Sequence, residues 1–131
     1  MTGENNLKAL LKNMSPTMQD DAFVFLTSKE GFSEEIQREA VMVFKEVEGM
    51  TVIVRKEFAR TLSAQNEHQW AMITLTVHSD LNAVGFLAAI TEKLAEVGIS
   101  VNAVSAFYHD HLFVPWEKRM EAMEILHSLS E

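Results

Sequence analysis

The chain has 131 residues, of which 47% are apolar and 23% charged, the balance of a folded globular protein with room for one ordinary domain or two small ones. It has no cysteine, which excludes disulfides, thiolate metal sites and a cysteine nucleophile and leads us to expect a cytoplasmic protein. A net charge of −8 with scattered Lys and Arg argues against a nucleic-acid partner, and the apolar stretch AVGFLAAIT is too short to span a membrane.

The first 38 residues predict a helix, a strand and a loop. Residues 6–14 carry apolar side chains at helical spacing, and Ser15-Pro16 ends this helix because the residue before proline avoids the helical region. Residues 22–27 (AFVFLT) form an apolar, aromatic run typical of a buried strand. Residues 28–38 are polar, and we predict a loop there with one helical turn at most.

A hairpin and a short helix complete the first half. Residues 40–47 and 50–54 are rich in β-branched side chains, and Glu48-Gly49 between them can supply the positive φ of a tight turn. Residues 57–62 predict a short helix, and the polar stretch 66–69 is the best internal boundary. We therefore expect two domains, which cover residues 1–66 and 67–131.

The second half opens with a clearly alternating strand at residues 70–77. A helix is predicted from about Asn82 to Val97, ended by Gly98. Its expected buried stripe is Ala83, Leu87, Ile90, Leu94 and Val97.

Two further strands and a closing helix follow. The strands are expected at residues 99–107 and 112–114, and the helix at residues 116–129. The helix is expected to carry Trp116, Met120, Met123, Leu126 and Leu129.

This order of elements predicts an α+β fold. A strand–helix–strand unit with a right-handed crossover, followed by an antiparallel strand, makes a ferredoxin-like sheet with helices on one face. The hairpin-plus-helix unit occurs in both halves, so we expect two tandem βαββα units. The polar residues expected at one edge of the second sheet are His78, Ser79, Asp80, Asn82, Asn102, Tyr108, His109 and His111.

Residues 77–106 (VHSDLNAVGFLAAITEKLAEVGISVNAVSA) resemble the ACT domain, through a strand, a polar turn, a glycine at the start of a helix, and an asparagine in the strand after Gly98-Ile99. With the EGMTVIV hairpin of the first half, the chain is similar to stand-alone tandem ACT proteins and to the regulatory domains of aspartate kinases. The resemblance implies a regulatory, non-catalytic module that binds an amino acid, takes no cofactor, and acts as a homodimer or on a partner enzyme.

An amino acid needs partners for a carboxylate and an ammonium group. A helix N-terminus suits the carboxylate, Gly85 admits close backbone approach, Asn102 can donate and accept, and Asp80 can take the ammonium. The full set of expected ligand-binding residues is His78, Ser79, Asp80, Leu81, Asn82, Ala83, Val84, Gly85 and Asn102.

Other interpretations stay open. Ser79, Asp80 and Asn82 are also common helix caps, and Asn102 could make a structural bond at a strand edge. His78, His109 and His111 could bind zinc, although histidines near a hairpin tip are more often polar turn residues. A protein–protein adaptor without a small ligand is the third alternative.

Overall fold

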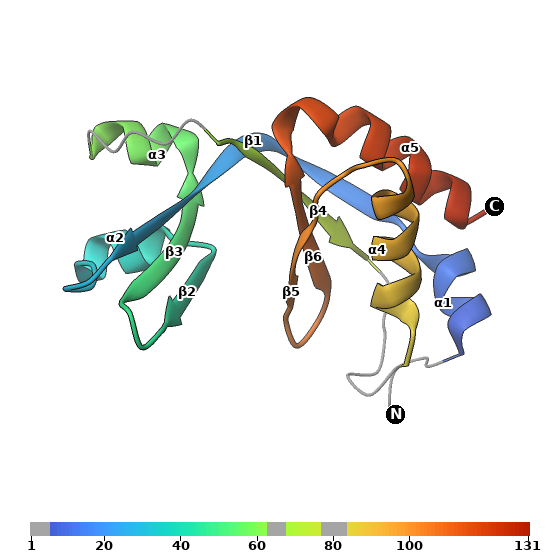
Figure 1. The fold of residues 1–131 in the computed structure, drawn as a ribbon, viewed down its shortest axis with the longest axis horizontal. Coiled ribbons are helices and arrows are strands. Elements are labelled where there is room, and N and C mark those ends of the chain that lie inside the picture. Colours follow the sequence, from blue (N-terminus) through green and yellow to red (C-terminus); the bar gives the residue numbers. More distant parts are fainter. Residues whose placement is uncertain (1–5, 63–67, 77–83) are drawn as a thin grey trace. The chain divides into compact units, whose positions relative to one another are not determined.

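The computed structural model describes residues 6–62, 68–76 and 84–131. The chain divides into two compact units: residues 20–70 form one, and the residues up to 19 join those from 71 onward in the other. Each unit contains a strand, a helix, a β-hairpin and a closing helix in that order (Figure 1). The predicted α+β fold of two ferredoxin-like βαββα units is thereby confirmed. The division into halves 1–66 and 67–131 stays a prediction.

The chain enters through helix α1 (Leu7–Asn13) and strand β1 (Pro16–Ser28). Asn6 caps α1, since its side-chain oxygen accepts a hydrogen bond from the Ala9 N–H at 3.1 Å. Leu10 and Met14 are buried in the core of the unit that contains residues 71–131. The predicted strand at 22–27 is confirmed, but β1 begins six residues earlier, directly at Pro16.

In the unit of residues 20–70, the strand order is β2-β3-β1. Its elements after β1 are α2 (Glu34–Glu39), β2 (Met42–Lys45), β3 (Met50–Arg55) and α3 (Lys56–Thr61). All paired strands are antiparallel, with Val24 opposite Val54 and Val43 opposite Val52. The buried core here consists of Val24, Val52, Val54 and Ala59. The prediction of at most one helical turn at 28–38 was wrong, because Ser33 caps a longer helix.

The loop of the β2–β3 hairpin lies one residue earlier in the chain than expected. Glu46 and Gly49 exchange both backbone hydrogen bonds, at 2.8 and 3.3 Å, so the loop is Val47-Glu48 rather than Glu48-Gly49. Gly49 is required by a close approach: a Cβ there would lie 2.6 Å from the backbone oxygen of Ser28. No side chain can occupy that space without moving backbone.

In the other unit, the strand order is β1-β4-β6-β5, with antiparallel pairing between β5 and β6. After β1 the elements are β4 (Trp70–Leu75), α4 (Phe86–Glu96), β5 (Asn102–Ser105), β6 (Asp110–Pro115), the 3₁₀ turn η1 (Trp116–Lys118) and α5 (Arg119–Leu129). Ala71, Ile73 and Leu75 are fully buried, which confirms the predicted alternation of β4. Helices α4 and α5 contribute Ile90, Leu94 and Leu126 to the same core.

Helix α4 begins later than predicted, at Phe86 rather than Asn82. Its buried residues are Phe86, Ile90 and Leu94, each four positions apart. The prediction for Val97 was wrong: it is the C-cap residue and 48% exposed. Ala83, also assigned to the buried stripe, lies outside the described residues.

In the last hairpin β5 is shorter and β6 longer than predicted, and the closing helix α5 starts later. Ala106 donates its N–H to the His109 carbonyl at 3.0 Å, so Phe107-Tyr108 form a two-residue loop and β5 ends at Ser105. Trp116 lies in η1, and α5 buries Ala122 and Leu126. Met120, one of the apolar residues that this helix was expected to carry, is 61% exposed.

Candidate functional site

The connection between β4 and α4 is where most of the predicted ligand-binding residues fall. His78, Ser79, Asp80, Leu81, Asn82 and Ala83 lie outside the described residues. The structure describes Val84, Gly85 and Asn102. Val84 and Gly85 directly precede α4, and Asn102 is the first residue of β5.

Gly85 is the N-cap residue of α4 and has a left-handed φ of 86°. A side chain there would be strained by the backbone, since L residues with a Cβ rarely adopt this conformation. Its carbonyl accepts the first helical hydrogen bond, from the Ala89 N–H at 2.9 Å. The nearest atom to a hypothetical Cβ is Leu7 Cδ2 of α1, at 3.8 Å, which is ordinary contact. Gly85 is therefore required by backbone conformation and not by crowding.

Among the described residues, the start of α4 shows neither of the two features that usually stabilise a helix N-terminus, a capping side chain and an acidic residue in the first turn. Gly85 has no side chain that can accept from the first turn, and that turn contains no acidic residue. A helix N-terminus has free N–H groups and a partial positive charge, so it favours an anionic partner. Within the described part of the chain, no anionic side chain serves this end of α4.

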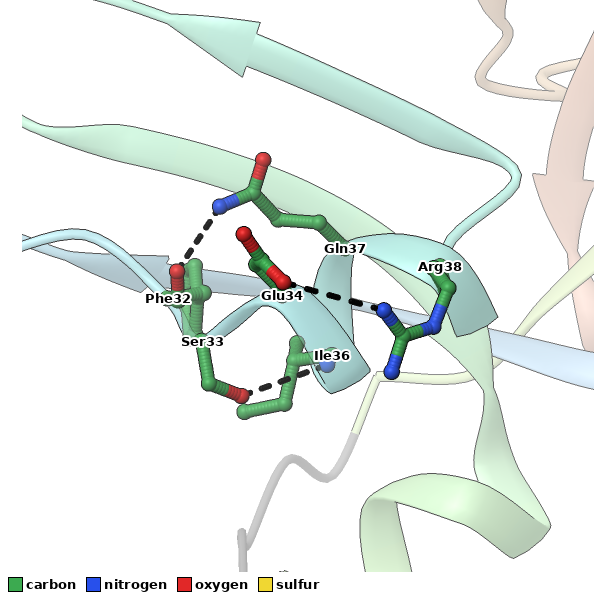
Figure 2. Close-up of polar contacts among 6 residues, drawn as sticks. All are labelled: Phe32, Ser33, Glu34, Ile36, Gln37 and Arg38. Atoms are coloured by element: carbon green, nitrogen blue, oxygen red, sulfur yellow. Dashed lines mark hydrogen bonds and ion pairs between the residues drawn. The ribbon is translucent and has the colours of Figure 1, made fainter.

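Helix α2 stands at the equivalent place in the other unit and is self-capped (Figure 2). Ser33 Oγ accepts from the Ile36 N–H at 3.3 Å, and Gln37 Nε2 donates to the Phe32 carbonyl at 2.8 Å. Glu34 and Glu35 supply negative charge in its first turn. The N-terminus of α2 is thus capped and neutralised by side chains of its own segment. The described residues show no such side chains at the N-terminus of α4.

A repeated dipeptide links the two connections. Gly31-Phe32 precedes α2 and Gly85-Phe86 begins α4, and the two glycines have φ values of 88° and 86°. Phe86 is buried in one core and Phe32 packs against the other. Sequence analysis missed this repeat, although the Gly-Phe pairs were visible as a signal that both connections turn in the same way.

Asn102 lies apart from Gly85. Gly85 precedes the first residue of α4, whereas Asn102 follows its C-terminus at the start of β5 (Figure 1). The 11 residues of α4 span about 16 Å between the two positions. Asn102 is exposed and pairs with Phe113 in the register, which puts its side chain on the sheet face opposite Leu112 and the helices. The end of α4 that begins at Gly85 is shared instead by the loop of the β5–β6 hairpin (Figure 1).

The histidines near that loop make specific contacts. His111 Nδ1 lies 2.9 Å from Thr74 Oγ1, which joins side chains of β6 and β4. The ring centroids of His109 and His111 are 6.4 Å apart. Within the described part of the chain, no three His, Cys, Asp or Glu side chains are grouped to hold a metal ion. His78, the third residue of the zinc alternative, lies outside that part.

Tyr108, one of the residues expected at this edge of the sheet, is 76% exposed and contacts Phe107 edge-to-face. The hairpin loop is Phe107-Tyr108, and Asp110 is the first residue of β6. A shallow groove of about 400 Å³ lies elsewhere in this unit, between the outer face of α4 and residues 99–101.

Two models of the ACT domain match the sequence, one over residues 2–70 and one over residues 66–128. The chain belongs to the ACT domain family. It is therefore a tandem of regulatory, ligand-binding ACT domains, as the resemblance implied.

Solved structures agree with this assignment. A Vibrio cholerae protein of unknown function, described as a possible transport protein, is 38% identical with a TM-score of 0.85, over 95% of this chain and 96% of that one. An Agrobacterium tumefaciens protein is 13% identical with a TM-score of 0.66, over 89% of each chain. A proposed C-terminal regulatory domain of aspartate kinase from Porphyromonas gingivalis is 17% identical with a TM-score of 0.54, over 89% and 96%. The last two show the fold alone.

A search of curated proteins found no match. Across the described ranges, none of the helices has the length and apolar character needed to cross a membrane.

Proposed function

We propose that the tandem ACT protein is a non-catalytic regulatory module that binds an amino acid at the β4–α4 connection, residues 78–85. The observation that carries the proposal is the contrast between two equivalent helix starts. Helix α2 has a Ser33 cap and two glutamates in its first turn, whereas α4 has Gly85 as its N-cap residue and no acidic residue in its first turn. A free carboxylate is the partner that such an uncapped N-terminus favours.

The chemistry of the connection supports a zwitterion. Backbone N–H groups of the first turn of α4 would bind the ligand carboxylate, and the Asp80 carboxylate would accept from its ammonium group. His78, Ser79 and Asn82 supply further donors and acceptors in the same stretch. All four of these side chains belong to the ligand-binding set predicted from the sequence.

Asn102 defines how far the site extends. It was predicted as a ligand contact, and it lies at the other end of α4 from Gly85. We expect Asn102→Ala to leave affinity within about twofold of wild type if the ligand contacts only the connection. A tenfold or greater loss would extend the site to β5.

The regulatory role concerns a partner. The protein would act as a homodimer or by binding an enzyme of amino-acid metabolism, in the cytoplasm, with no cofactor. Its family membership supports this assignment over the zinc alternative.

A thermal-shift panel of the twenty amino acids tests the proposal. A ligand at a hundred times its dissociation constant adds about 2.7 kcal/mol to the free energy of unfolding, which is a shift of several degrees for a chain of this size. We expect Asp80→Asn to abolish the shift and Ser33→Ala, the matched change at α2, to preserve it. If no amino acid raises the melting temperature, the proposal is wrong. Stoichiometric copurified zinc would favour the metal alternative.

A further inference from the structure

Strand β2 presents an apolar edge to its surroundings. It lies at the end of the strand order β2-β3-β1, so β3 is its only neighbour among the described strands. The exposed apolar side chains of this hairpin are Val41, Val43, Phe44 and Val47. Soluble proteins usually protect such an edge with charges, prolines or bulges, because free backbone groups beside apolar side chains attract another strand.

The edge strand of the other unit is protected. Strand β5 stands at the equivalent place, at the end of the order β1-β4-β6-β5. Its exposed residues are Asn102, Ala103 and Ser105, which are small or polar, and its larger apolar residue Val104 is half-buried. The apolar edge is therefore specific to β2 and is not a general property of the fold.

The backbone of β2 determines which of its groups are free at this edge. Glu46 exchanges both backbone hydrogen bonds with Gly49, so its backbone groups face the returning strand. Because these groups alternate in direction along an antiparallel strand, those of Phe44 also face β3. The N–H and C=O groups of Val43 and Lys45 point outward, away from β3.

We propose that β2 pairs with β2 of a second copy of this chain, antiparallel and about a two-fold axis at Phe44. In this register Val43 lies opposite Lys45 of the second copy, and the two residues exchange both backbone hydrogen bonds. The two-fold axis repeats the pair, since a residue that contacts its partner is contacted in the same way. Every outward N–H and C=O group of these two residues is then satisfied in both copies.

The same register also covers the exposed apolar side chains. Phe44 faces Phe44 of the second copy across the axis, as an aromatic cross-strand pair. Val41 lies near Val47 of the second copy at each end of the paired segment. Val43 packs along the aliphatic stem of Lys45. Hydrogen bonding and apolar burial thus favour one and the same alignment.

Neighbouring registers are worse. A shift of one residue would set outward backbone groups against inward ones. A shift of two residues that places Val43 opposite itself would pair Lys45 with Val41, whose N–H already donates to the Ile53 carbonyl at 2.8 Å. The opposite shift would place Lys45 against Lys45, and like charges directly opposite are destabilising. The alignment about Phe44 avoids all three costs.

The pairing gives the homodimer of the proposed function a definite surface. It involves no residue of the connection 78–85 and no amino-acid ligand, so it is independent of the proposed binding site. A short strand pair makes a small interface, and small interfaces belong to weak, transient complexes. We therefore expect a dimer that forms and dissociates with protein concentration.

Sedimentation velocity of the full chain tests association. We expect monomer at about 10 µM and substantial dimer at about 500 µM, the range of a small interface. Val43→Pro removes an outward N–H and leaves the pairing with β3 in place, and it should weaken dimerisation at least about tenfold. Ala103→Pro is the matched change at the equivalent position of β5 and should stay within about twofold of wild type. Circular dichroism checks that both variants are folded.

Cysteine cross-linking tests the register without a proline variant. The chain has no cysteine, so a single introduced thiol can pair only with its own copy. In the proposed register, Phe44→Cys brings two such residues together as a non-hydrogen-bonded pair with Cα atoms about 4.5 Å apart, which a disulfide can bridge. Under air oxidation we expect its covalent dimer to form at least about tenfold faster than that of Lys45→Cys, or of Val104→Cys at the equivalent position of β5.

Two results would overturn the inference. One is a wild-type chain that stays monomeric at the highest concentration, which would leave β2 open to a strand of a different protein. The other is an equal rate of cross-linking at the three cysteine positions. A monomeric chain that binds an amino acid would overturn the inference alone. A dimer that responds to no amino acid would overturn the proposed function alone.

Discussion

The lowered pKa of His111 makes the free energy of unfolding depend on pH in a predictable direction. Its pKa is lowered in the folded state, mainly by burial, so the unfolded chain binds the proton more tightly. The free energy of unfolding is therefore higher above pH 6.5 and falls as pH drops below it. We predict a loss of under about 1 kcal/mol between pH 7.5 and 5.5, because the half-buried ring is partly screened by solvent.

Urea denaturation at the two pH values measures this loss. His111→Gln is the comparison, and we expect the difference between the two pH values to shrink in it. A variant with the same or a larger difference would assign the pH dependence to other groups.

Glycine is required at position 49 and at position 98 for different physical reasons. A Cβ at Gly49 would meet the Ser28 backbone oxygen at 2.6 Å, whereas nothing lies within 4 Å of one at Gly98, which has a φ of 78°. We predict that Gly98→Ala costs about 1 kcal/mol through left-handed strain alone and that Gly49→Ala costs about 2–3 kcal/mol. Chemical denaturation gives both values. Equal costs would show that the β2–β3 hairpin shifts readily away from Ser28.

The conformation and position of single residues were the hardest properties to predict from the sequence. Gly85 was expected inside or at the start of a helix, yet its left-handed φ depends on the path of the connection, which local spacing does not reveal. Asn102 was grouped with the helix start because the predicted fold placed both at one edge of the sheet and the ACT resemblance included both. Their separation follows from the direction of β5, which begins only after α4 has ended.

The stripe of α4 shows what a periodic pattern can and cannot predict about an element. Ile90 and Leu94 were predicted and are fully buried, because a spacing of four places them on one face. The same pattern wrongly extended to Val97, since the chain leaves the helix there and Ile99 N–H returns to the Leu94 carbonyl at 3.0 Å. Periodicity identified the helix, and the ends depended on backbone geometry.

Replacement of the last two stripe residues tests this boundary. We predict that Leu94→Ala costs about 2–5 kcal/mol because it opens a cavity in the core. Val97→Ala, which shortens a half-exposed side chain, should cost less than about 0.5 kcal/mol. Thermal unfolding followed by circular dichroism compares them. A large effect of Val97→Ala would mean that the helix packs one turn further than the structure shows.

For the whole molecule, the order of elements was the most predictable property. Alternation in β4, the hairpin at Gly49 and the stripe of α4 led to two βαββα units before any contact was known. The early start of β1 and the extra turn of α2 were missed. Pro16 was interpreted only as the end of a helix and Ser33 only as part of a loop, whereas Pro16 begins β1 and Ser33 caps α2. The contrast between the two helix starts, a Ser33 cap with two glutamates at α2 and a left-handed Gly85 at α4, became visible only in three dimensions.

The central claim is that α4, and not α2, offers its N-terminus to an amino acid. A two-dimensional amide NMR titration of the ¹⁵N-labelled protein with a mixture of the twenty amino acids tests it most directly. We predict that amides of residues 78–88 shift while those of residues 31–37 stay in place. Shifts confined to residues 31–37, or no shifts at millimolar concentrations, would contradict the account.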